Sequence, residues 1–206
     1  MSDHLETLPR DQPAKQIGIL LFEGVEELDA MGPWEVLSHW TQEYPEDEWQ
    51  VALVSLDGRP VAGAKGAILT PHEALPRVLD AIVVPGGAGT RPLMRDEPLL
   101  ARLREFHATG TLVTSVCTGA LVLAVAGLLQ GRPATTYHAC FDELIAAEPT
   151  VLPRRDARWV DDGDIVTSAG VSAGIDMSLH LVRRLAGESR AVQVKRGIEY
   201  DPEPPI

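Results

Sequence analysis

Cys117 is the residue whose place in the sequence most favours chemistry. The apolar run 111–116 predicts a buried strand, and the apolar run 118–129 predicts a helix that starts at once. Cys117 would then lie in a sharp turn at a helix N-terminus, where unpaired N–H groups and the helix dipole stabilise an anion. Such a setting lowers the pKa of a thiol. We predict a nucleophilic thiolate; the alternative is a buried, inert cysteine, which is common in strand cores.

Carboxylic acids cluster after the first apolar run, residues 16–22, and one of them can serve Cys117. The candidates are Glu26, Glu27 and Asp29. A carboxyl group beside a thiolate can hydrogen-bond it, or can carry a proton if its own pKa is raised. The alternative for Asp29 is a helix cap, because Gly32 and Pro33 follow it and Pro33 suits a first helical position.

A glycine-rich turn at Gly86, Gly87 and Gly89 follows the apolar run 81–84. Its backbone N–H groups, together with that of Thr118, can form an anion hole for the same reaction. The turn lacks the third glycine of a dinucleotide-binding fingerprint, because Thr90, Arg91 and Pro92 come next. The alternative is a plain tight turn.

Residues 170–174 (GVSAG) match the pattern of a serine hydrolase elbow around Ser172. The only acid and histidine directly downstream, Asp176 and His180, would lie on the same helix and recede from Ser172 by about 1.5 Å per residue. They cannot form a triad with it, so we expect Ser172 to cap that helix. The sequence holds no HExxH or CxxC pattern, and we predict no metal site.

The elements that must position these residues alternate between strands and helices. The strands are expected at 16–22, 49–56, 81–84, 111–116 and 165–168, with 157–160 pairing to the last of them. The helices are expected at 33–39, 98–107, 118–129, 139–147 and 174–186. This alternation predicts an α/β fold with a mostly parallel sheet, in which sites form at the carboxyl ends of strands.

Composition limits the protein to a few classes. The chain has 206 residues, 45% of them hydrophobic, and a formal net charge of −12. We predict one domain over residues 16–200, with tails at 1–15 and 201–206. The acidic balance argues against nucleic-acid binding, and no apolar run is long enough to span a membrane. Two cysteines make no disulfide framework, so we expect a reduced, cytoplasmic protein.

Five stretches together resemble the ThiJ/PfpI superfamily. They are residues 24–36 (GVEELDAMGPWEV), 83–89 (VVPGGAG), 114–120 (TSVCTGA), 134–136 (ATT) and 168–176 (SAGVSAGID). The resemblance covers about residues 16–200. It implies a flavodoxin-like three-layer α/β sandwich and a homodimer.

Within the superfamily, the motifs are most similar to isonitrile hydratases and to the amidotransferase-like domains of some transcription regulators. The hydratase resemblance implies a lyase that needs no cofactor. Cys117 would attack the terminal carbon of an isonitrile to give a thioimidate, and Asp29 would manage the proton or orient the water. The N–H groups near Gly87, Ala88 and Thr118 would hold the developing charge, and Val171 would line the substrate pocket.

Two departures from the superfamily pattern bear on the chemistry. Tyr137 stands where relatives often have a histidine, and His138 comes one residue later, on the opposite face of an extended segment. Asp29 replaces the glutamate of many members, which favours the hydratase branch by resemblance. The alternatives are another cysteine enzyme of the superfamily, an amidase, peptidase or glyoxalase-like enzyme, or a redox or stress sensor that uses Cys117.

Overall fold

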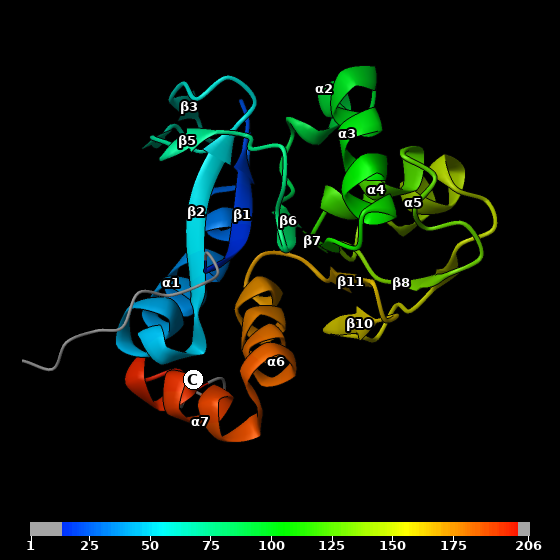
Figure 1. Ribbon diagram of the computed structural model, residues 1–206. Coiled ribbons are helices and arrows are strands. Elements are labelled where there is room, and N and C mark those ends of the chain that lie inside the picture. Colours follow the sequence, from blue (N-terminus) through cyan, green and yellow to red (C-terminus); the bar gives the residue numbers. More distant parts are fainter. Residues whose placement is uncertain (1–13, 202–206) are drawn as a thin grey trace, which may run out of the picture.

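The core of the fold is a seven-stranded, mostly parallel sheet (Figure 1). The structure is a computed structural model, and it describes residues 14–201. In sheet order the strands are β10 (Trp159–Asp161), β11 (Ile165–Ser168), β7 (Leu112–Val116), β6 (Ala81–Val84), β1 (Lys15–Leu21), β2 (Trp49–Ser55) and β5 (Glu73–Ala74). Only β10 runs antiparallel to its neighbour. The predicted α/β class and the predicted pairing of β10 with β11 are confirmed.

Strands β1, β6 and β7 form the centre of the sheet, and nearly all of their residues are buried. Ile17 and Ile19 in β1 and Ile82 in β6 are fully buried. Such strands suit a parallel sheet that is covered by helices on both sides. The parallel register brings the carboxyl ends of β1, β6, β7 and β11 to one rim of the sheet.

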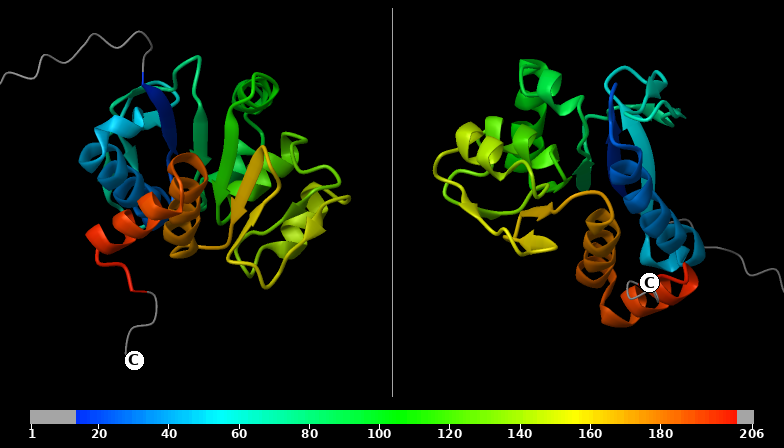
Figure 2. Two further views of the ribbon diagram at one scale, coloured as in Figure 1. Left: turned by 60° about the horizontal axis from the view of Figure 1, so that its bottom comes forward. Right: turned by 180° about the vertical axis from the view of Figure 1, so that it is seen from behind.

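Helices cover both faces of this sheet, which gives the predicted three layers. They are α1 (Glu27–Glu43), α2 (Thr90–Leu93), α3 (Glu97–Ala108), α4 (Gly119–Val125), α5 (Phe141–Ala147), α6 (Ala173–Ala186) and α7 (Glu188–Gly197). Helices α1, α6 and α7 pack together on one side, and α3, α4 and α5 gather on the other (Figure 2). A short 3₁₀ turn (Pro45–Asp47) and two small strand pairs, β3 (Val61–Ala62) with β4 (Ile68–Leu69) and β8 (Pro133–Ala134) with β9 (Leu152–Pro153), complete the fold.

The first helix begins six residues earlier than the sequence suggested. Helix α1 starts at Glu27, so Pro33 lies inside it rather than at its first position. Packing explains the difference, because a Cβ on Gly32 would lie 3.1 Å from Ile175 of α6, and one on Gly174 would lie 3.4 Å from Pro33. The close approach of α1 to α6 stabilises a helix that Pro33 alone would interrupt.

Other boundaries also moved. Helix α4 ends at Val125 rather than 129, because Gly127 follows with a left-handed φ of 79°. The polar helix α7 and the two-residue strands were not predicted. The predicted tails lie mostly outside the described residues, although Lys15 is already the first residue of β1.

Asp164, in the turn before β11, connects three segments at the edge of the fold. Its carboxylate accepts hydrogen bonds from the Arg132 guanidinium and pairs with Nε2 of His107 at 2.7 Å. The bond from Arg132 is the main reason that the pKa of Asp164 falls to about 2. These contacts join α3 and the segment before β8 to the β10–β11 turn.

We expect Asp164→Asn to lower the Tm at pH 7. A carboxyl whose pKa is lowered by folding adds stability above its unfolded-state pKa, and loses it as the pH falls through its folded-state pKa. The gap in Tm between wild type and variant should therefore narrow as the pH falls from about 4 towards 2. Calorimetry at several pH values measures it, with the exposed Asp156→Asn as control. A gap that stays constant down to the lowest pH would contradict this role.

Candidate active site

Cys117 lies in the tight turn between β7 and α4. Its backbone is left-handed, with φ of 56°, and its N–H group points at the carbonyl oxygens of Ser168 and Ala169, each at 3.1 Å. The turn requires a glycine two residues on, because a Cβ on Gly119 would lie 2.0 Å from the carbonyl oxygen of Val84. The residue is 7% exposed, so the thiol is nearly buried.

Asp29 is the carboxylic acid that the fold brings to Cys117. It lies in the first turn of α1 and is fully buried. Its Oδ2 accepts a hydrogen bond from the N–H of Gly86 at 3.0 Å, and the Cys117 thiol and the N–H of Val171 also interact with the carboxyl group. The N-cap position of α1 belongs to Glu26. The alternative role of Asp29 as a helix cap is therefore wrong.

Gly86 makes this arrangement possible. A Cβ at position 86 would lie 2.7 Å from Oδ2 of Asp29 and 2.6 Å from the backbone nitrogen of Thr118. Only a residue without a side chain can therefore pass between the carboxyl group and the start of α4. The sequence predicted the glycine turn, but not the close contact of Gly86 with Asp29 and Thr118.

The buried thiol and the buried carboxyl share a region with little solvent. Burial raises the pKa of Asp29 to about 7, against hydrogen bonds from Gly86 and Cys117 that lower it. Burial, and then the negative charge of Asp29, raise the pKa of Cys117 to about 12. The predicted lowering of the thiol pKa is therefore wrong. The N–H groups at the helix start are present, but burial and the adjacent carboxylate outweigh them.

The backbone donors that face the sulfur are the N–H groups of Thr118 and Val171. Both favour the ionised thiol, and that of Val171 also favours the ionised Asp29. Of the predicted donors on the glycine turn, Gly87 donates its N–H to Oγ1 of Thr118 at 2.9 Å. Ala88 is exposed on the same turn, and its part in an anion hole stays a prediction. The turn also positions Asp29, through the N–H of Gly86.

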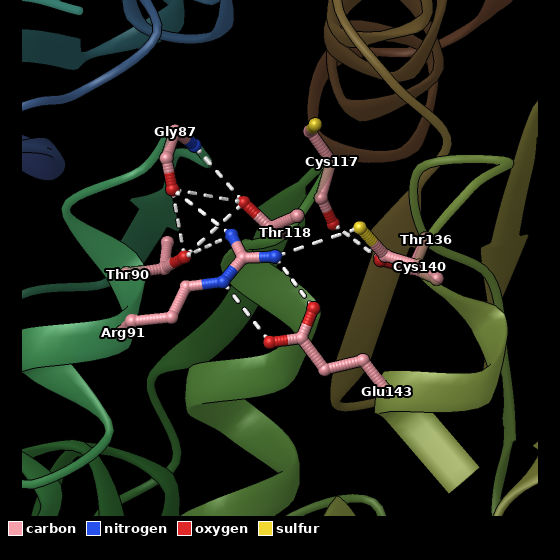
Figure 3. Close-up of polar contacts among 8 residues, drawn as sticks. All are labelled: Gly87, Thr90, Arg91, Cys117, Thr118, Thr136, Cys140 and Glu143. Atoms are coloured by element: carbon pink, nitrogen blue, oxygen red, sulfur yellow. Dashed lines mark hydrogen bonds and ion pairs between the residues drawn. The ribbon is translucent and has the colours of Figure 1, made fainter.

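A polar network that the sequence did not reveal supports this turn (Figure 3). Arg91 forms an ion pair with Glu143 of α5, its Nη1 contacts the carbonyl oxygen of Gly87 at 3.4 Å, and its Nη2 lies 3.6 Å from Sγ of Cys140. Thr136 donates to the carbonyl oxygen of Cys117 at 2.8 Å. Arg91 therefore connects the glycine turn to α5, and Cys140 lies partly exposed beside this cation. Long-range pairs of this kind leave no local pattern in a sequence.

The two residues that depart from the superfamily pattern lie near the Val171 turn. The Tyr137 ring covers Gly170, where a Cβ would lie 2.4 Å from Cδ2 of the tyrosine. His138 is exposed and its ring lies tilted against that of Tyr137, with the ring centroids 4.3 Å apart and an angle of 42° between the planes.

The serine hydrolase alternative has no support in the geometry. His180 pairs with Asp161 at 2.7 Å, and Asp176 accepts hydrogen bonds from Arg158 and Tyr200. Ser172 stands at the N-cap position of α6, as expected, but its side chain makes no capping hydrogen bond.

The described residues lack two kinds of feature. In residues 14–201, no three His, Cys, Asp or Glu side chains come together in a way that would hold a metal ion. Within the same range, no helix has both the length and the apolar character needed to cross a membrane.

Comparisons with known proteins agree with these features. Residues 15–184 match the DJ-1/PfpI family. An isonitrile hydratase from Pseudomonas putida is 46% identical over 94% of this chain and 82% of its own length. An HTH-type transcriptional regulator from Pseudomonas aeruginosa is 28% identical over 94% of this chain, which spans only 53% of the regulator. A solved ThiJ/PfpI family protein from Pseudomonas syringae superposes with a TM-score of 0.82 at 30% identity, covering 98% of this chain and 86% of that one.

We expect Asp29→Asn to lower the pKa of the Cys117 thiol by about one to two units, because it removes a neighbouring negative charge and leaves the burial in place. The pH dependence of alkylation by iodoacetamide measures the shift, in a Cys140→Ser background so that one thiol reports. Glu35→Gln is the matched control, since Glu35 is an exposed acid on the same helix. An unchanged or higher thiol pKa would contradict the arrangement.

Proposed function

The chain belongs to the DJ-1/PfpI family, and on that premise we propose that it is a cysteine-dependent isonitrile hydratase. The reaction would convert an isonitrile and water to an N-substituted formamide. The observation that carries the proposal is the buried pair of Asp29 and Cys117, in which one proton can move between a carboxyl and a thiol. The isonitrile hydratase relative at 46% identity supports the same substrate class.

The pair can supply both a nucleophile and a proton. Above the Asp29 pKa of about 7, the thiol and the carboxylate together hold one proton, because burial and mutual repulsion oppose a second negative charge. Asp29 takes the thiol proton as sulfur bonds to the terminal carbon of R–N≡C, and returns it to that carbon. The product is the thioimidate R–N=CH–S–Cys117. The N–H groups of Thr118 and Val171 stabilise negative charge on the sulfur during this step.

Water then releases the product. Asp29 accepts a proton from water as the oxygen bonds to the thioimidate carbon, and passes that proton to the nitrogen. When the resulting R–NH–CH(OH)–S–Cys117 collapses, the C–S bond breaks and the hydroxyl proton passes by way of Asp29 to the sulfur. This step leaves R–NH–CHO and the free thiol. Atoms balance with water as the only co-reactant, so the sequence of steps calls on no cofactor.

Two features argue against the alternatives. A Cys–His hydrolase needs a base beside the cysteine, and His138 is exposed on Tyr137 instead. A peroxide sensor reacts through an accessible, low-pKa thiolate, whereas Cys117 is nearly buried and its pKa is raised. The homodimer, the cytoplasmic location and the pocket-lining role of Val171 remain proposals.

We expect the wild type to hydrate an aryl isonitrile, followed in the ultraviolet as the formamide forms. Cys117→Ser and Asp29→Asn should each lower kcat/KM by at least about a hundredfold, because each removes half of the pair. The wild-type kcat/KM, plotted against pH, should rise on the acid side of the profile with a midpoint near the Asp29 pKa of about 7.

Cys140→Ser is the control for general thiol loss and should keep most of the activity. A folded wild type that turns over no isonitrile would refute the proposal, as would a fully active Cys117→Ser variant. Turnover of amides or dicarbonyls instead would indicate another enzyme class in the family.

A further inference from the structure

The β3–β4 hairpin lies outside the main sheet, and its tip packs on the beginning of α1. The N–H of Ala64 donates to the carbonyl oxygen of Val25 at 2.8 Å. Oε1 of Glu27 accepts the N–H of Lys65 at 2.7 Å. The fit is close, because a Cβ on Gly63 would lie 2.5 Å from the same Glu27 oxygen. The tip, residues 63–67, is therefore held on the turn of helix that carries Asp29.

This docking places a cation over the acidic start of α1. Nζ of Lys65 contacts the Glu26 carboxylate and lies 3.9 Å from Oε2 of Glu27. The Lys65 side chain is 68% exposed, whereas that of Glu26 is only 18% exposed. Glu26 is in turn linked to Asp29, whose N–H donates to the Glu26 carbonyl oxygen at 3.0 Å.

The charges that face Asp29 come from three elements. The Cys117 thiol comes from the β7–α4 turn, the Glu26 carboxylate from the start of its own helix, and the Lys65 ammonium from the hairpin. The N–H groups of Gly86 and Val171 complete its surroundings. Because Asp29 is fully buried, water screens these charges poorly.

We propose that Lys65, at the tip of the β3–β4 hairpin, is a positioning residue. It acts through Glu26 to set the pH above which Asp29 of the Asp29–Cys117 pair is ionised. Its cation balances Glu26, whose negative charge opposes ionisation of Asp29. With the tip docked, Asp29 gives up its proton at lower pH than it would beside an unpaired Glu26. The inference rests on the proposed function only in treating this pair as the reactive centre.

The test is a titration that does not depend on turnover. The ¹³C chemical shift of the Asp29 carboxyl carbon, assigned by its loss in Asp29→Asn, gives the pH midpoint directly. We expect Lys65→Met to raise this midpoint by about half a pH unit and Glu26→Gln to lower it by a similar amount, as expected for single partly screened charges. Lys65→Arg should restore the wild-type midpoint, since it keeps the cation.

The control is Arg59→Met, which removes a positive charge from the loop before β3. Arg59 is 83% exposed and pairs with Asp57, so the Asp29 midpoint should not move. In Lys65→Met and in Glu26→Gln, the acid limb of the pH profile of kcat/KM for isonitrile hydration should shift in the same direction as the carboxyl midpoint.

The outcomes separate the two proposals. If Lys65→Met, like the control Arg59→Met, does not move the pH midpoint of the Asp29 carboxyl, the role of the hairpin is refuted. This conclusion holds whatever substrate the enzyme hydrates. If the midpoint shifts as expected but no isonitrile is turned over, the hairpin role stands and the proposed reaction fails. A shift of the Asp29 midpoint to lower pH in Lys65→Met, or to higher pH in Glu26→Gln, would also overturn the inference.

Discussion

The site depends on the burial of one carboxyl group against one thiol. Asp29 is fully buried, and its pKa of about 7 lies well above the ordinary value of 3.8. A carboxyl whose pKa rises on folding costs no stability while both states keep it protonated, and costs increasingly as the pH rises to its folded-state pKa. Above that pH the penalty reaches about 4 kcal/mol, at 1.36 kcal/mol per pKa unit. The remaining fold must be stable enough to carry this penalty at neutral pH.

Much of the surrounding architecture can be understood as the means of holding that pair. The parallel strands β1, β6 and β7 end at one rim, so the start of α1, the glycine turn and the Cys117 turn meet there. Gly86 and Gly119 allow backbone to pass where any side chain would collide. Arg91 connects the glycine turn to α5, because it contacts the carbonyl oxygen of Gly87 and pairs with Glu143. Each of these supports comes from a different element, which makes the site a product of the whole fold.

The sequence predicted what depends on local pattern, and it failed where long-range burial decides. Apolar runs and their ends placed Cys117 in a turn before a helix and placed Asp29 on the same rim. The direction of the thiol pKa was wrong, because a helix N-terminus is visible in a sequence and the depth of burial beside a carboxylate is not. The N–H of Gly87 was assigned to the anion hole because its hydrogen bond to Thr118 joins residues 31 apart, and no local pattern reveals such a bond. Helix α1 was predicted too short because its packing on α6 overrides the effect of Pro33.

The left-handed backbone at Val171 bears on how the site can change over evolution. Its φ of 51° is unfavourable for a β-branched residue, by roughly 1–2 kcal/mol, yet the part of Val171 that faces Cys117 is its N–H group. The side chain is only half-buried. Substitutions here can therefore alter the surface near the thiol while the donor stays in place, an option that Gly86 and Gly119 do not have. Given the proposed role of Val171 in lining the substrate pocket, position 171 is a place where new substrate preferences can arise without loss of the reactive pair.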